Sequence, residues 1–167
     1  MRLIPTFRAI CLAAVTALAS PPVIANAGSL KDENLVALMP KGFVVGKTEN
    51  QGSILITEFV PTGETVHDWT QMVTVQIFHN LKRFDPDAFV GAIGKQWSAA
   101  CEKSTVQKLK SGQENSYPFT LWLMSCPLNG QTGKPENTWV KAIEGNDSLY
   151  SVQYALRTGL TAEAIPR

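Results

Sequence analysis

The amino-acid sequence predicts an α+β fold, in which a mainly antiparallel sheet of about five to seven strands carries one long helix on one face. The first observation behind this prediction is a group of strand-like segments before residue 80, and the second is another such group after residue 104. The third is a single strongly helical stretch between them, over about 86–103. Strands, one helix and further strands in this order are typical of a sheet that is covered by a helix on one side.

The start of the chain predicts an export signal rather than a folded element. A basic start with no acidic side chain precedes an apolar run over residues 9–19, and a small-x-small sequence follows at 25–27. The apolar run is shorter than the roughly 20 residues that a helix needs to span a bilayer. We therefore expect residues 1–27 to be a cleaved signal peptide, with no membrane span left after cleavage. We expect residues 28–167 to form a single globular domain that is periplasmic or secreted.

Before the long helix, the chain predicts one short helix and three strands. Residues 30–39 carry apolar side chains at helical spacing and end at Pro40, which predicts a short amphipathic helix. Alternating or β-branched patterns predict strands over 43–45, 53–60 and 72–78.

The long helix is the element that the residues define best. Asp85 is a suitable N-cap, and Pro86 suits the first helical position because it has no N–H to pair. Phe89, Ile93 and Trp97 then recur every four residues and so share one face of a helix. We expect this face to pack on the sheet.

After the helix, the pattern is strand-like almost to the end of the chain. We expect strands over 105–110, 117–126, 138–144 and 149–157. The second of these is apolar on both faces, which is typical of a central strand covered on both sides. Thr161 is a suitable N-cap for a final short helix.

The cysteines predict one disulfide. Cys11 lies inside the expected signal peptide, so that Cys101 and Cys126 remain in the exported domain. An even number of cysteines in an oxidising compartment indicates a disulfide, which here serves as a structural staple because no Cys-x-x-Cys motif is present. The alternative is two free or metal-ligating thiols, although two thiols and two distant histidines make a poor zinc site.

Composition argues against several classes of function. The chain has 15 basic and 14 acidic side chains and no basic stripe, so nucleic acid is not an expected partner. We expect no cofactor and no bound metal, because the motifs that hold such groups are absent.

Two features are candidates for a binding surface. Glu64, His67 and Asp68 form the densest polar cluster, and such side chains can ligate a metal or transfer protons. Their spacing matches no recurrent catalytic or metal motif, which favours a surface turn. Trp139 follows a loop over 127–137 that is rich in Gly, Pro and Asn, so we expect this aromatic side chain to offer an exposed contact.

Three segments carry a resemblance to known proteins: residues 38–43 (LMPKGF), 58–65 (EFVPTGET) and 69–74 (WTQMVT). In these segments the chain resembles small exported proteobacterial proteins of unknown function, which implies export but supplies no activity and no site residues. The order of the expected elements is similar to that of PsbP-like α/β domains. That second resemblance implies an assembly or binding module, on topology alone.

The residues therefore favour an exported, non-catalytic domain that binds another envelope or secreted protein. Two alternatives stay open. One is a hydrolase or metal-dependent enzyme that uses Glu64, His67 and Asp68, with His79 converging on them in a cleft. The other is an inhibitor of a lysozyme or protease, presented on the loop over 127–137.

Overall fold

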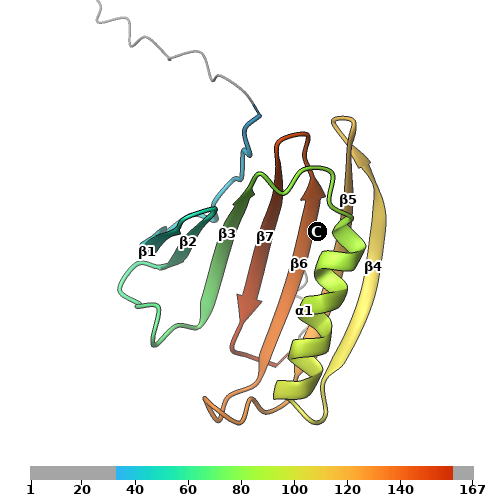
Figure 1. Cartoon of the computed structure of the whole chain (residues 1–167). Helices are drawn as coiled ribbons and strands as arrows, with labels where there is room; N and C mark the ends of the chain where they lie inside the picture. Colours follow the sequence, from blue (N-terminus) through green and yellow to red (C-terminus); the bar gives the residue numbers. More distant parts are fainter. Residues whose placement is uncertain (1–32, 160–167) are drawn as a thin grey trace, which may run out of the picture. The chain divides into compact units, whose positions relative to one another are not determined.

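The computed structural model describes residues 33–159, which belong to the second of two units in the chain, Lys31–Arg167. The expected signal peptide over 1–27 and the final helix at Thr161 lie outside the described residues. Seven strands and one helix make up the described part (Figure 1). In chain order they are β1 (Phe43–Gln51), β2 (Ile54–Pro61), β3 (Gln71–His79), α1 (Pro86–Ala100), β4 (Thr105–Glu114), β5 (Tyr117–Cys126), β6 (Glu136–Glu144) and β7 (Ser148–Leu156).

The seven strands form one sheet in the order β1-β2-β3-β7-β6-β5-β4, and every neighbouring pair is antiparallel. With α1 packed against this sheet, the predicted α+β fold is confirmed. The strand expected at the centre is β5, but β5 lies beside the edge strand β4. The central strand is β7. From the β4 edge, strands β4 to β7 pair as successive hairpins, and β7 then pairs with β3.

Helix α1 begins where its residues predict and ends earlier than expected. The carboxylate of Asp85 accepts a hydrogen bond from the backbone N–H of Asp87 at 2.9 Å, which caps the first turn. The helix ends at Ala100 rather than near Lys103, because Cys101 has an extended backbone with φ of −138°. There the chain turns toward β5, to which the Cys101 side chain is joined.

The main core lies between α1 and strands β4 to β6, which the helix covers (Figure 1). Val90 of the helix is fully buried, and the half-buried Phe89, Ile93 and Trp97 pack beside it, as their spacing predicts. On the sheet, the fully buried residues of this core are Met124, Val140 and Ala142.

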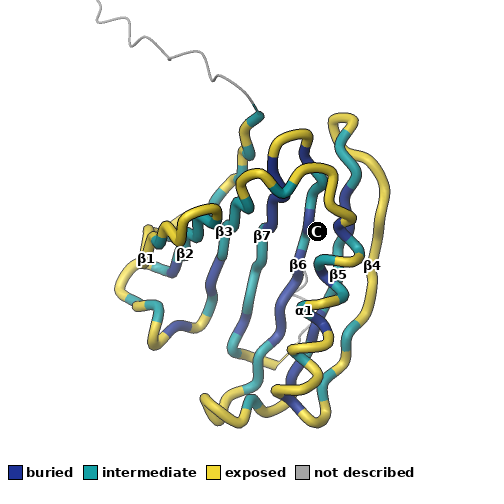
Figure 2. The backbone as a smooth tube through the Cα atoms, viewed as in Figure 1, coloured by how far each residue is buried: buried dark blue, intermediate teal, exposed yellow. Residues whose placement is uncertain are grey.

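The two edge strands are longer than expected. β1 and β4 are mostly exposed, whereas buried and half-buried residues run along the strands between them (Figure 2). Their outer parts are polar and lack the alternation of apolar and polar residues that predicts a strand. Pairing with the neighbouring strand of the hairpin extends β1 to Gln51 and β4 to Glu114. Each edge strand contains a β-bulge, between Val45 and Lys47 and between Lys108 and Lys110, a feature that discourages pairing with other chains.

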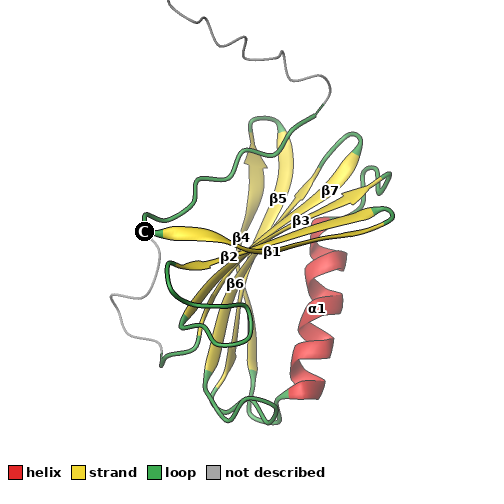
Figure 3. Ribbon diagram, turned by 90° about the vertical axis from the view of Figure 1, so that its left-hand side faces the viewer, coloured by secondary structure: helices red, strands yellow, loops and turns green. Residues whose placement is uncertain are grey.

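The short helix expected over 30–39 is wrong for the residues that the structure describes. Residues 33–40 are extended and lie on the sheet face opposite α1 (Figure 3); we call them the strap. Leu35, Ala37 and Met39 are half-buried, while the residues between them are exposed. This alternation suits an extended segment lying on an apolar sheet face, and that contact outweighs a weak local helical pattern.

Candidate functional site

Three chain segments meet at one end of the sheet (Figure 1). They are the loop over 62–70 between β2 and β3, the loop over 127–135 between β5 and β6, and residues 157–159 after β7. Antiparallel hairpins place alternate connections at the same end of a sheet, so this gathering follows from the topology. We call these three segments the loop end.

Arg157 connects the loop over 62–70 to the first residue of β6. Its guanidinium lies 3.9 Å from the centre of the Trp69 ring, which is a cation–π contact. Its Nη1 donates a hydrogen bond to the backbone carbonyl of His67 at 3.4 Å, and its Nε lies 3.9 Å from the Glu136 carboxylate. Because the Arg157 side chain is only 12% exposed, these contacts are partly shielded from water.

Glu64, the first residue of the predicted polar cluster, closes the loop over 62–70. One carboxylate oxygen accepts a hydrogen bond from the Thr70 backbone N–H at 2.6 Å, and the other accepts one from the Thr70 hydroxyl at 2.7 Å. The hydrogen bonds from the Thr70 hydroxyl and backbone lower the pKa of Glu64. The carboxylate is therefore held as a structural acceptor.

His67 and Asp68 are exposed at the loop end. Asp68 pairs with Lys134 of the neighbouring loop at 3.1 Å, which links the two loops. His79 does not join this cluster, because the loop precedes β3 and His79 is the last residue of that strand, at the opposite end of the sheet. Among residues 33–159, no three or more His, Cys, Asp or Glu side chains are grouped to hold a metal ion.

The loop over 127–135 is ordered by Asn129. The Asn129 carbonyl accepts hydrogen bonds from the N–H groups of Thr132 at 3.2 Å and Gly133 at 2.8 Å, and its side-chain oxygen accepts one from the Gln131 N–H at 2.9 Å. Leu128, by contrast, is 63% exposed. The loop is thus internally braced while its outer side chains face solvent.

The disulfide lies at the base of this loop. Cys101 and Cys126 are joined in the structure, with their Cα atoms 5.9 Å apart, which is an ordinary distance for such a bond. The pairing is the one that the sequence predicts. It ties the end of α1 to the end of β5 immediately before the loop over 127–135 begins.

The expectation that Trp139 is an exposed contact is wrong. Trp139 is only 6% exposed and packs against Tyr154, with ring centres 6.1 Å apart. Strand β6 already begins at Glu136, so Trp139 lies inside a strand rather than at the tip of a loop. Its register partner is Tyr154 of the central strand, which places its side chain over the middle of the sheet.

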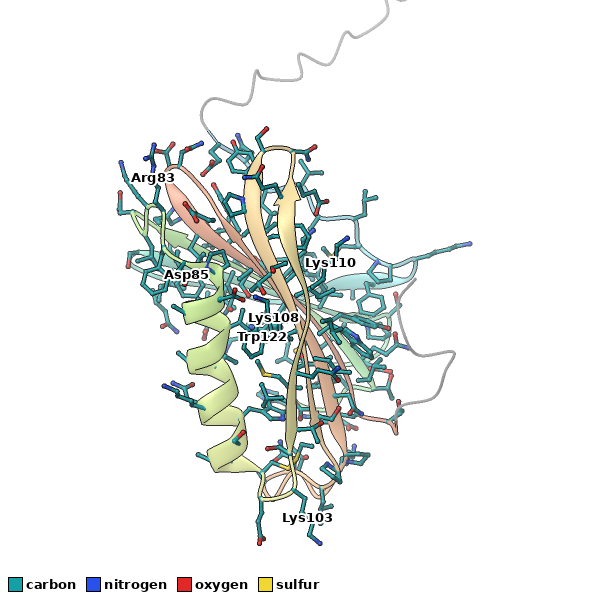
Figure 4. The ribbon with its side chains drawn as sticks, turned by 90° about the vertical axis from the view of Figure 1, so that its right-hand side faces the viewer. Arg83, Asp85, Lys103, Lys108, Lys110 and Trp122 are labelled. Carbon is teal, nitrogen blue, oxygen red and sulfur yellow. A yellow bond between two sulfur atoms is a disulfide. The ribbon has the colours of Figure 1, made fainter. Side chains whose placement is uncertain are left out.

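A polar network beside α1 was not anticipated from the residues (Figure 4). The Asp87 carboxylate accepts hydrogen bonds from the Lys108 ammonium at 2.5 Å and from the Trp122 indole N–H at 3.2 Å. The pKa of Asp87 is lowered, mainly by the hydrogen bond from Lys108 and next by a hydrogen bond from Thr120. Because a β-bulge lies between Lys108 and Lys110, Lys108 points toward α1 while Lys110 points to the other side of β4.

Neither a protein-family model nor a curated protein sequence matches this chain. Within residues 33–159, no helix is both long enough and apolar enough to span a bilayer.

Proposed function

We propose that this protein is an exported, non-catalytic binding domain, periplasmic or secreted, whose loop end docks on a partner protein. One observation carries the proposal. Two loops from different hairpins are linked by the Asp68–Lys134 pair, and Arg157 holds the first of these loops against the start of β6, while the outer side chains of both loops remain exposed. A surface that is ordered before it binds loses little conformational entropy on association.

The chemistry of the loop end fits a protein partner. Leu128 offers an exposed apolar contact, and the same segments also expose the polar side chains of His67, Asp68 and Lys134. An apolar contact within a polar rim is the usual composition of a protein interface. The geometry gives a hydrolase less support, because both oxygens of Glu64 are already bonded to Thr70.

Export is supported by the signal-like residues 1–27 and by the disulfide. Disulfides persist in oxidising compartments such as the periplasm and the extracellular medium, and they are rare in the cytosol.

Affinity capture with quantitative mass spectrometry tests this proposal. The affinity-tagged protein is purified from the periplasm or the medium and compared with the loop-end variants Leu128→Asp and Lys134→Glu. Lys95→Glu, on the exposed side of α1, is the matched control. We expect a specific partner whose capture falls about tenfold with the loop-end variants, since central contacts carry most of the binding energy. A partner that both loop-end variants retain in full, or the absence of any specific partner, contradicts the proposal.

The second candidate is an inhibitor of a lysozyme or protease. The observation that favours it is the loop over 127–135, which the disulfide anchors at its base and which presents Leu128 at 63% exposure. A braced loop with one prominent side chain suits insertion into an enzyme cleft. Inhibition assays against lysozymes and proteases test it: Leu128→Asp should relieve any inhibition, and Lys95→Glu should not.

A further inference from the structure

The strap lies on the sheet face that α1 leaves open (Figure 3). Strap and sheet together line a cavity on this face. This cavity has a volume of about 390 Å³. Its floor comes from β6 and β7, its roof from the strap, and one wall from the end of the β4–β5 hairpin. That volume lies within the range of sites that bind small molecules. A second cavity of about 450 Å³ lies directly beside it, because the two share four lining residues: Glu33, Asn34, Leu35 and Tyr150.

The middle of the first cavity is aliphatic. Ile143 of β6 and Val152 of β7 point to this face, because their register partners Tyr150 and Lys141 line the same cavity. Leu35 and Ala37 of the strap line it from the other side. An alkyl chain placed between these side chains is removed from water, which favours binding in proportion to the apolar surface that is buried.

The charge of the cavity is distributed unevenly. Among the described residues that line it, Lys141 is the only cation. Its ammonium lies 4.9 Å from the centre of the Phe119 ring and pairs with the carboxylate of Glu114. The Glu114 side chain is 55% exposed and belongs to the last residue of an edge strand, so it can turn into water with little loss. Lys141 therefore has a counterion that another carboxylate can replace.

The other acid in the cavity does not compete for Lys141. The carboxylate of Glu33 accepts hydrogen bonds from the backbone N–H groups of Asn146 and Asp147 and from the Tyr150 hydroxyl. Its acceptor positions are therefore occupied. A ligand carboxylate is repelled from this end and directed toward Lys141.

We propose that this cavity binds a medium-chain carboxylate, with its alkyl chain between the strap and the sheet and its carboxylate on Lys141 in place of Glu114. Apolar contacts with Ile143 and Val152 hold the chain, and a charge-assisted hydrogen bond from Lys141 selects the head group. The cavity lies at the end of the sheet opposite the loop end, so this binding is independent of the proposed protein partner.

Titration calorimetry with decanoate, kept below its micelle concentration, tests the assignment on the purified protein. We expect one saturable site per chain, with decanol and decylamine binding more weakly. Lys141→Met should weaken decanoate binding about tenfold. Glu114→Gln should strengthen it about threefold, because it removes the competing counterion. Lys103→Met is the control, since Lys103 is an exposed lysine just after α1 that does not line the cavity; decanoate binding should not change.

A variant that fills the cavity from the strap completes the test. Ala37→Phe adds volume outside the sheet core and should abolish decanoate binding while near-UV circular dichroism stays unchanged. Three results would overturn the proposal: no saturable binding of decanoate, decylamine binding as tightly as decanoate, or Glu114→Gln weakening decanoate binding as Lys141→Met does. The last result would mean that the Lys141–Glu114 pair is only structural.

Discussion

The carboxylate of Glu33 accepts a hydrogen bond from the backbone N–H of Asn146 at 2.9 Å, although the two residues are 113 positions apart in the sequence. Its second oxygen accepts one from the N–H of Asp147 at 3.1 Å. The start of the strap is thereby attached to the turn between β6 and β7. The Tyr150 hydroxyl also donates a hydrogen bond to the Glu33 carboxylate at 3.2 Å, so Glu33 attaches the strap to both β7 and the turn that precedes it.

This attachment predicts a pH-dependent effect of Glu33→Gln. Partial burial raises the pKa of Glu33, but hydrogen bonds from Asn146, Asp147, Tyr117 and Tyr150 outweigh it and hold the pKa below its usual value of 4.5. A lowered pKa in the folded state stabilises the fold above the usual value, and that contribution is lost as the pH falls through the lowered pKa. We therefore expect Glu33→Gln to lower the free energy of unfolding by about 1 kcal/mol at neutral pH.

Urea denaturation at several pH values measures this effect. The difference between wild type and Glu33→Gln should shrink once the pH falls below 4.5. Glu102→Gln, at an exposed position just after α1, serves as the control and should leave the profile unchanged. A Glu33→Gln deficit that is equally large in acid would show that the charge of Glu33 does not matter.

Two glycines of α1 predict opposite effects of the same substitution. A Cβ at Gly94 would lie 2.9 Å from the Cγ1 atom of Val106, whereas a Cβ at Gly91 would meet nothing within 4 Å. Alanine is a better helix former than glycine by about 1 kcal/mol. We expect Gly91→Ala to stabilise the protein by up to that amount, and Gly94→Ala to destabilise it by about 1–2 kcal/mol through overpacking against β4. Thermal unfolding of both variants measures the two effects. Equal shifts of the melting temperature in the same direction would contradict the predicted difference between Gly91 and Gly94.

We expect the Cys101–Cys126 disulfide to contribute strongly to the stability of the fold. It links residues that are 25 positions apart, for which the loop-entropy relation gives about 3.5 kcal/mol. The double variant Cys101→Ala/Cys126→Ala should lose an amount of this order in denaturant unfolding. Mass spectrometry of wild-type protein, alkylated before lysis and kept non-reduced, should find no alkylated thiol in the exported chain. Two alkylated thiols per chain would refute the bond.

The stacking of Arg157 on Trp69 predicts that lysine cannot replace this arginine. Lysine keeps the charge but lacks the planar guanidinium that lies over the ring and reaches the His67 carbonyl. We expect Arg157→Lys to reduce the free energy of unfolding by about 1 kcal/mol and to make the loop over 62–70 easier to cleave with protease. Arg83→Lys, at an exposed site, should stay within about 0.5 kcal/mol of wild type. Equal losses in both variants would remove the special role of Arg157.

The N-terminal pattern predicts processing after Ala27. N-terminal sequencing of protein recovered from the periplasm or the medium should begin at Gly28. An intact chain that starts at Met1 and remains in the cytosol would exclude the expected signal peptide. It would also remove the oxidising environment on which the disulfide argument depends.

Local residue patterns predicted the helix and most strands because those patterns act over a few residues. The cap at Asp85 and the four-residue spacing of Phe89, Ile93 and Trp97 need only the helical period. At the candidate site, the polar cluster near His67 was found, but its partner Lys134 was not. That pairing depends on which hairpin ends meet at the loop end.

Local residue patterns were sufficient to predict the α+β class, the position of α1 and the pair of cysteines that can bond. They did not predict that β7 is the central strand, that Trp139 is buried or that the strap crosses the open face of the sheet. These features depend on strand order and register, which are set by contacts between residues far apart in the chain. Nothing near Glu33 in the sequence indicates that its partner is Asn146.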